Sequence, residues 1–284
     1  MMKKSLIALA VLAASGTAFA ATSNVDIYGQ ARLSLTSVDG AEYSMADQAS
    51  RIGLKGSEDL GGGMKASYHW ENKLSFATGF LNNSGSQRLA NVSIESGLGK
   101  LQIGSIYLPY KLVGTASLVE DTAADMVGTV ISSSTDAAVT GINYTSPTFS
   151  GVHAAIGLTN GNGKSSAALV YANGPLTASV AKQDITNTTD ATKFNIGYAM
   201  GDLTVKLTSE DQAGVKTNVI GATYAMGPVT LLANYADTDN AQGTRTVVGA
   251  VYSLSKRTNV VAAYADDKAG AVQDAITVQL NHAF

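Results

Sequence analysis

Residues that could carry out chemistry are sparse in this chain of 284 residues, and they form no catalytic pattern. The absence of Cys excludes a disulfide scaffold, a thiolate zinc site and a cysteine nucleophile. His69, His153 and His282 are isolated and lack the spacing of a metal motif, so a structural role is the better interpretation. The segment Asp237-Thr-Asp-Asn240 offers oxygen atoms to calcium but lacks the further ligands that a calcium loop needs. We therefore expect no enzyme activity, no catalytic residues, no metal and no cofactor.

The charged residues make up only 14% of the chain, and their balance argues against a nucleic-acid partner. A soluble domain usually carries about 25% charged residues. The pI is about 5.6 and the chain has no run of Lys or Arg, whereas binding to nucleic acid requires concentrated positive charge. Disorder is excluded as well, because it needs high charge and few apolar residues, and 45% of this chain is hydrophobic.

The first twenty residues have the pattern of a secretory signal peptide. Lys3 and Lys4 form a positive region, residues 6–14 are apolar, and Ala18-Phe-Ala20 provides small residues for a cleavage site. The apolar stretch is far shorter than the roughly 20 residues that a spanning helix needs. Cleavage after Ala20 leaves residues 21–284, with 17 basic and 22 acidic side chains and a formal charge of −5. With no other apolar stretch of spanning length, this chain can enter a membrane only as a barrel.

Most of the remaining chain alternates between apolar and polar residues with a period of two. In residues 276–284, for example, Ile276, Val278 and Leu280 share one face, while Thr277 and Gln279 share the other. Such alternation is typical of strands that face two different environments. A soluble β-sandwich shows it too, so the alternation alone leaves both architectures open.

A repeated tyrosine favours the barrel. The tyrosines at positions near the ends of successive segments are separated by 26 to 28 residues: Tyr144, Tyr171, Tyr198, Tyr224 and Tyr252. This period equals two strands of about ten residues with one short and one longer connection, so each tyrosine returns to the same face and the same end of the sheet. A ring of tyrosines at one level is typical of the aromatic girdle of a transmembrane barrel. A sandwich core gives no reason for such a level.

Sixteen strands can be delimited: 24–36, 47–57, 63–76, 86–96, 100–107, 137–146, 150–160, 164–173, 175–184, 190–201, 202–211, 214–226, 228–237, 242–254, 258–267 and 272–284. The number is even, as in bacterial single-chain barrels. Tight Gly-bearing connections alternate with longer polar ones, which predicts periplasmic turns and external loops. Residues 108–136 are too many for a plain hairpin loop. Since a barrel of this size has a wide lumen, we predict an all-β transmembrane antiparallel barrel whose long third external loop folds inward.

Strand alternation also predicts which charged residues face the lumen. In the first strand the apolar set includes Val25, Ile27 and Leu33, so Arg32 faces water; in the second, Ile52 and Leu54 place Arg51 there as well. The same reasoning adds six further lumen charges, Glu71, Lys73, Lys193, Lys206, Glu210 and Arg245. We expect this charged lumen to conduct water and ions.

Four segments carry a family resemblance. They are Asp26-Ile-Tyr-Gly29, the hairpin Ser50-Arg-Ile-Gly-Leu-Lys-Gly-Ser-Glu-Asp-Leu-Gly-Gly-Gly-Met-Lys-Ala66, Leu254-Ser-Lys-Arg-Thr258 and the terminal Phe284. Together they resemble the general-diffusion porins of Gram-negative outer membranes, over nearly all of residues 21–284. The resemblance implies a homotrimer of sixteen-stranded barrels, each with its own pore, in which acids on the third loop face basic residues on the wall.

Within this resemblance, Arg51 and Arg88 match basic positions of the pore wall. Glu120, Asp121 and Asp125 match, loosely, the acidic segment of the constriction loop at 108–136. Alternation groups Arg88 with lipid-facing residues, so it reaches the lumen only through a bulge; otherwise it lies at the outer rim. We predict that Arg88 faces the lumen.

Two departures from the family pattern thin the basic wall. Ser105 and Ala137 stand where the family usually has Arg. Opposed charges across a narrow aqueous gap produce a transverse field that disfavours apolar solutes. With fewer bases on the wall and a formal charge of −5, we expect anion preference to be weak or absent and cation preference to be possible.

The predicted function is passive diffusion of ions and small hydrophilic solutes across the bacterial outer membrane. A substrate-specific channel is the alternative, and an outer-membrane enzyme on a barrel is a weaker one. A sugar channel typically has a ladder of lumen-facing aromatic residues, and Tyr28 is the only tyrosine of the first strand with that parity. The expected partners are two further copies of the chain, outer-membrane lipid and lipopolysaccharide, and the outer-membrane assembly machinery. The terminal strand with Phe284 resembles the signal that this machinery reads.

Overall fold

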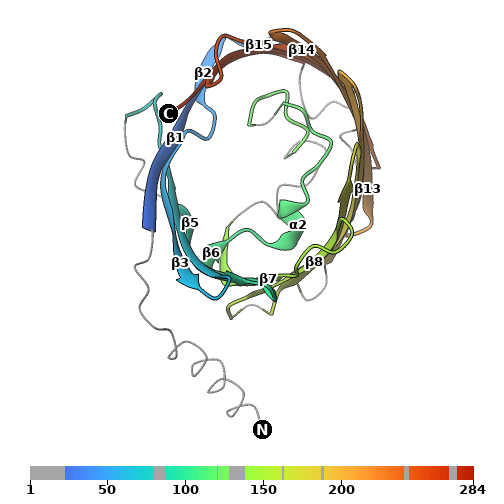
Figure 1. Ribbon diagram of the computed structural model, residues 1–284. Helices are drawn as coiled ribbons and strands as arrows, with labels where there is room; N and C mark the ends of the chain where they lie inside the picture. The colour runs from blue at the N-terminus through green and yellow to red at the C-terminus, as the bar shows by residue number, and fades with distance from the viewer. Residues whose placement is uncertain are drawn as a thin grey trace.

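The alternating segments form one closed antiparallel sheet around a central lumen (Figure 1). The computed structural model describes residues 23–79, 87–119, 121–127, 138–161, 163–186, 189–239, 243–268 and 274–284. The expected signal peptide, Glu120, and residues 128–137, which include part of the expected constriction loop and Ala137, lie outside these ranges. No helix in the described part of the chain is long and apolar enough to cross a membrane.

The elements follow one another around the barrel as a meander. In chain order they are β1 (Ser23–Val38), β2 (Ser44–Asp47), β3 (Arg51–Gly61), β4 (Met64–Lys73), β5 (Gln87–Ser96), β6 (Gly99–Ile106), α2 (Pro109–Leu112), β7 (Val139–Thr145), β8 (Val152–Thr159), β9 (Ser165–Asn173), β10 (Leu176–Thr186), β11 (Thr189–Met200), β12 (Leu203–Gln212), β13 (Val215–Met226), β14 (Val229–Thr238), β15 (Thr244–Ser253), β16 (Thr258–Asp267) and β17 (Ala275–Ala283).

The barrel wall has the predicted sixteen strand positions, although the described ranges contain seventeen strands. Both β2 and β3 pair with β1, one after the other along its length, so they occupy a single position in the wall. Between them the chain breaks step at Ala49, whose φ is 57°. The sequence predicted one continuous second strand from 47 to 57. The interruption was missed because nothing in an Ala residue signals a left-handed backbone conformation.

The two ends of the sheet meet at β1 and β17, and this seam closes the barrel. The register runs from Gln30 opposite Ala283 to Val38 opposite Ala275. At the end of the seam, the backbones of Gly29 and Phe284 exchange two hydrogen bonds of 2.9 and 3.0 Å. A Cβ at Gly29 would lie 2.4 Å from the Phe284 ring, so only glycine leaves room for the terminal side chain there.

The outer wall is apolar and the inner wall is small and polar, as the alternation predicts. Large apolar side chains on the outward positions stay exposed in the isolated chain, for example Ile27 at 69% and Phe194 at 56%. Inward positions carry buried polar residues such as Thr277, Gln279 and Asn234. A face that is exposed and apolar on every strand requires a lipid solvent, which a soluble sandwich does not have.

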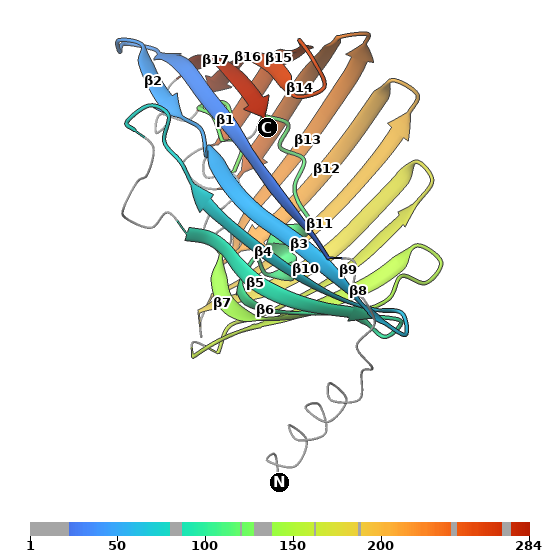
Figure 2. The same cartoon turned by 60° about the vertical axis from the view of Figure 1, so that its left-hand side comes forward.

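The segment that follows β6 enters the lumen instead of forming an external loop (Figure 1). It carries α2 and lies within the ring of strands in both views, which places it across the channel rather than beyond its rim (Figure 2). We call its described residues, 107–119 and 121–127, the inner loop. The inner loop lies within the predicted constriction loop apart from Tyr107, and its position brings loop side chains to the wall.

Candidate pore constriction

Two arginines from neighbouring strands flank one carboxylate on the lumen wall, and a third arginine lies beside them. Arg51 on β3 and Arg88 on β5 flank Glu71 on β4, with 3.6 Å between Arg51 Nε and Glu71 Oε2 and 2.6 Å between Arg88 Nε and Glu71 Oε1. Arg32 on β1 lies beside them and pairs with the inner loop instead. We call Arg32, Arg51, Arg88 and Glu71 the arginine wall. The carboxylate of Glu71 neutralises part of the positive charge of this wall. Glu71 is 5% exposed and lies between the guanidinium groups of Arg51 and Arg88.

A tyrosine and a histidine extend this cluster. The hydroxyl of Tyr28 donates to Glu71 Oε2 over 2.7 Å, and the Tyr28 hydroxyl oxygen lies 2.5 Å from Nε2 of His69. Since the hydroxyl has one hydrogen and gives it to Glu71, the Tyr28 oxygen accepts from Nε2–H of His69. The sequence assigned His69 no partner. The signal that could have found it is parity, because His69 and Glu71 share the inward face of β4.

The lumen position of Arg88 depends on a bulge in β5. Glu71 pairs with Leu89 and the next residue, Asn72, pairs with Gln87, so Arg88 is an extra residue in the ladder. A bulge of this kind re-aims a side chain that alternation would send to the other face. The hydroxyl of Ser105 on β6 donates to the Arg88 carbonyl over 3.0 Å. The residue that stands where the family usually has Arg therefore supports the backbone that turns Arg88 inward.

Two acids of the inner loop take different positions. Asp121 Oδ2 lies 2.8 Å from Arg32 Nη1 and joins the loop to the arginine wall. Asp125 turns into the loop, where it accepts hydrogen bonds from Ser117 Oγ at 2.8 Å, from the backbone N–H of Asp121 at 2.7 Å and from that of Val127 at 2.9 Å. Burial raises the pKa of the Asp125 carboxyl to about 6. Asp121 can act on passing ions, whereas Asp125 organises the loop.

Polar side chains of the opposite wall hold the inner loop by its backbone. Asn234 on β14 donates to the carbonyl of Ala116 over 2.7 Å and accepts from the N–H of Leu118 over 3.0 Å. Three further wall side chains make similar bonds to the loop backbone, Asn143 to Tyr107, Ser166 to Tyr110 and Thr208 to Ala116. These side chains satisfy backbone groups of the loop that a neighbouring strand would otherwise pair with. They thereby hold the loop at a defined distance from the wall.

An apolar contact supports the same attachment. Ala116, Val119, Ala124 and Met126 of the inner loop pack against apolar inward residues of β13 to β16. Gly221 on β13 has no side chain where the loop passes, and a Cβ there would lie 2.6 Å from the Ala116 carbonyl oxygen. The loop is thus docked on one side of the lumen, which leaves its Asp121 facing the arginine wall on the other.

The remaining predicted lumen charges divide into two groups. Lys193, Glu210 and Arg245 are buried under the inner loop: the Lys193 amine lies 4.3 Å from the centre of the Tyr110 ring, Glu210 accepts from the Tyr110 hydroxyl, and Arg245 bonds to the Ala123 carbonyl and pairs with Asp267 at 2.6 Å. Lys73 and Lys206 are exposed to the lumen. The sequence could not separate these groups, because the path of a non-periodic loop decides which charges it covers.

The tyrosines of the repeat lie on the outward face near the Gly-bearing turns. Tyr144, Tyr198, Tyr224 and Tyr252 are exposed, and Tyr171 is half-buried. Tyr235 and Tyr264 are exposed nearer the opposite ends of β14 and β16, and Phe194 is exposed near the middle of β11. These residues fall outside the 27-residue period, so the sequence repeat missed them. Aromatic residues that border an apolar outer band are typical of barrels that span an outer membrane.

No group of three or more His, Cys, Asp or Glu that could hold a metal ion occurs among the residues that the structure describes. Asp237 and Asp239 of the possible calcium segment are described, whereas Asn240 is not. His153 lies on β8 and His282 on β17, and these two strands are not neighbours in the sheet.

A closed barrel with an apolar outer band, outward-facing tyrosines near one end of its strands and a charged lumen narrowed by an inward loop defines a channel-forming protein of the bacterial outer membrane. Residues 6–271 match the family described as Gram-negative porin. Outer membrane porin protein 32 of Delftia acidovorans is 31% identical over an alignment 308 positions long, which covers 90% of this chain and 87% of the relative. Major outer membrane protein P.IB of Neisseria meningitidis serogroup A is 28% identical, with 92% of each chain covered.

Solved structures show the same fold. An anion-selective porin from Comamonas acidovorans superposes with a TM-score of 0.74 at 23% identity and covers 93% of this chain and all of the other. OmpT, an outer membrane protein of Vibrio cholerae solved in a trimer form, superposes with a TM-score of 0.73 at 15% identity, over 93% of this chain and all of the other. The chain belongs to the Gram-negative porin family. It forms a channel in the outer membrane for passive diffusion, and the members of this family are channels rather than enzymes.

Proposed function

We propose that this porin is a weakly ion-selective channel whose narrow section lies between the arginine wall and Asp121 of the inner loop. The observation that carries the proposal is charge compensation at this section. Arg32 is paired with Asp121 across the lumen, while Arg51 and Arg88 share Glu71. A wall whose bases are matched by nearby acids presents a transverse field but little net charge to a passing ion.

Anion selectivity is the rival proposal, since the Comamonas acidovorans porin that shares this fold is described as anion-selective. Arg32, Arg51 and Arg88 outnumber Glu71 and Asp121 at the narrow section, which favours the rival. The exposed amine of Lys73 opposite Arg51 favours it as well. The total formal charge of −5 for residues 21–284 favours the opposite sign. A substrate-specific channel remains a further candidate, with Tyr28 and Tyr107 as its lumen-side aromatic residues.

A reversal-potential measurement decides between these proposals. We expect purified protein in a planar bilayer under a KCl gradient to give a potential close to zero, because neither ion is strongly favoured. Repeating the gradient at low and high salt provides the control, since a Debye length of about 10 Å at 0.1 M shrinks to about 3 Å at 1 M. A potential that is clearly anion-selective at all salt concentrations overturns weak selectivity. A current that saturates with one added solute supports a substrate-specific channel instead.

The partners of the channel are proposals of the same kind. A homotrimer is supported by the trimer form of the Vibrio cholerae neighbour and by the exposed apolar outer face of β1 to β6, which includes Val25, Val92 and Ile94. Contact with lipopolysaccharide is assigned to Lys216, which lies near the external end of β13 with its side chain exposed. Lys182 at the corresponding level of β10 pairs with Asp190 over 2.7 Å and offers less free charge. The signal peptide at 1–20 is proposed from the sequence alone.

The terminal residue is proposed to serve assembly. We expect deletion of Phe284 to lower the amount of barrel in the outer membrane at least several-fold, because the residue both seals the seam at Gly29 and completes the terminal strand. Barrels that still insert should conduct as before, since the Phe284 ring packs at Gly29, which shares the outward parity of Val25 and Ile27, and so lies on the other side of the wall from the lumen charges. Membrane yield and single-channel conductance measure the two effects. The matched control is Leu280→Ala, which shortens an outward side chain of the same strand. An unchanged yield after Phe284 deletion refutes the assembly role.

A further inference from the structure

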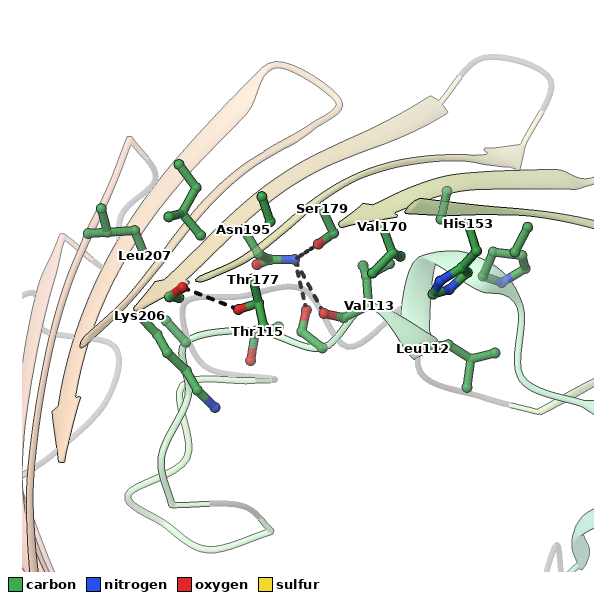
Figure 3. Close-up of a pocket in the computed structure, with 18 of the residues that line it drawn as sticks. Leu112, Val113, Thr115, His153, Val170, Thr177, Ser179, Asn195, Lys206 and Leu207 are labelled. Carbon is green, nitrogen blue, oxygen red and sulfur yellow. Dashed lines mark hydrogen bonds between the residues drawn. The ribbon is translucent and has the colours of Figure 1, made fainter. Parts of the chain in front are cut away.

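A cavity of about 350 Å³ lies between the inner loop and the lumen wall of β8 to β12 (Figure 3). The arginine wall occupies other strands, β1 to β5, so this cavity is a separate feature of the lumen. The residues that shape it are Leu112 and Val113 of the loop and His153, Val170, Asn195 and Lys206 of the wall. None of the described residues that line it is acidic.

The strand register explains how a small apolar floor lies beside polar side chains in the cavity. His153 pairs with Val170, Val170 with Ser179, and Ser179 with Asn195, so these four inward residues lie side by side on β8 to β11. In the adjacent inward row, Ala155 pairs with Ala168. Small and apolar side chains therefore make the floor, and Leu112 and Val113 cover it from the loop. An apolar surface of this kind favours a hydrocarbon group.

One end of the cavity carries a lysine and the other an imidazole ring. Figure 3 shows Lys206 at one end, with its amine directed away from the strands, and the His153 ring at the other. Lys206 pairs in register with Gly197 and Gly221, so no side chain crowds it from either neighbouring strand. No ion pair or hydrogen bond joins the Lys206 amine to a residue within the described ranges. The hydroxyl of Thr115 lies at the same end and can donate to an anion, because it is the acceptor in its bond with the N–H of Ser117, whereas Thr177 donates to the Gly197 carbonyl over 3.4 Å (Figure 3).

The polar residue in the middle of the cavity is already engaged. Asn195 donates to Ser179 Oγ over 3.0 Å and to the carbonyls of Val113 and Gly114 over 3.4 Å. Its carbonyl oxygen accepts from Thr208 Oγ1 over 2.7 Å. The charged recognition of a ligand is therefore left to one end, at Lys206.

We propose that this cavity binds small amphiphilic monocarboxylates, with the carboxylate at Lys206 and the aliphatic chain over Val170 beneath Val113. A single lysine suits one anionic group rather than a phosphate or a dicarboxylate, which cluster several bases or a bidentate Arg. The volume is near the lower end of the roughly 300–1,000 Å³ range of small-molecule sites, which fits a short chain. The proposal goes beyond passive diffusion, because it gives the lumen a saturable site for one class of solute.

Hexanoate is the probe, and acetate and hexylammonium are its controls, since acetate lacks the chain and hexylammonium reverses the charge. We expect hexanoate to lower the single-channel current in a saturable way and the two controls to have no saturable effect. Lys206→Met should weaken the apparent affinity at least tenfold, whereas Lys216→Met, the same change outside the cavity, should leave it unaltered. Val170→Phe should fill the apolar part and abolish the effect, and Leu169→Phe, on the outward face of the same strand, should not.

Equilibrium dialysis of radiolabelled hexanoate with the full-length protein in detergent gives a second readout that needs no conductance. It separates this proposal from the channel's selectivity, because binding can fail while the reversal potential behaves as expected. Equal effects of hexanoate and acetate overturn the proposal. So does an equal loss of affinity in Lys206→Met and Lys216→Met. If Val170→Phe yields no folded barrel, as judged by its unheated gel mobility, Lys206→Met still decides the outcome.

Discussion

Replacing Glu71 with Gln should increase the preference of the channel for anions about threefold to fivefold. A charge about 8 Å from a passing ion in water interacts with it by about 0.5 kcal/mol. Removing a negative charge acts with opposite sign on anions and cations, so the difference between them changes by about 1 kcal/mol. Gln keeps an acceptor for the Tyr28 hydroxyl, and Arg51 and Arg88 are left without their carboxylate. The substitution thereby removes charge and preserves shape.

The reversal potential under a KCl gradient at low salt measures this effect. Glu95→Gln is the matched control, because Glu95 is an acid of the neighbouring strand β5 and lies opposite Lys65 and Lys100 in register, near the turn end of its strand. We expect the control to shift the potential far less than Glu71→Gln. Similar shifts for both variants mean that the arginine wall does not form the narrow section that sets selectivity.

The second large effect is expected from Asn234→Leu, which should loosen the inner loop. Leu has nearly the shape of Asn but cannot pair with the Ala116 carbonyl or the Leu118 N–H. Leaving a buried donor or acceptor unsatisfied costs about 1–3 kcal/mol. Two such groups on the loop backbone therefore weaken its attachment to the wall substantially. We expect noisier single-channel currents and a higher mean conductance, because an undocked loop obstructs the lumen less.

Asn195→Leu provides a graded control for the loop. Asn195 also donates to loop carbonyls, but over 3.4 Å, which marks weaker bonds. It should therefore increase current noise less than Asn234→Leu does. Equal noise in the wild type and Asn234→Leu, with both barrels folded, contradicts the attachment of the loop by Asn234.

Alternation predicted the sheet because every strand meets the same two environments. Ile276 faces lipid and Thr277 faces the lumen, and each residue type suits its environment. A period of two therefore predicted both where the strands lie and which side chains point inward. The boundaries differ from the structure by a few residues at most strands, since polar strand ends look like loops. The prediction also placed Arg32 and Arg51 on the inward face, where the structure has them.

The parts that sequence could not predict depend on local departures from that period. A single extra residue at Arg88 reverses its facing, and no residue type marks such a bulge. The inner loop has no period at all, so its contacts with Asn234 and its cover over Lys193 follow only from its folded path. Contacts beside the arginine wall, such as that of Tyr28 with His69, required the register of three strands at once.

The seam between Gly29 and Phe284 has a consequence in time. The hydrogen bonds that close the ring join β1 to β17, so a chain without β17 contains no complete ring. Until β17 is synthesised, β1 has an unpaired edge, and such edges invite pairing with other chains. A chain in transit to the membrane therefore gains from being kept apart from its copies, and the loss of β17 costs the closure of the whole barrel rather than one strand.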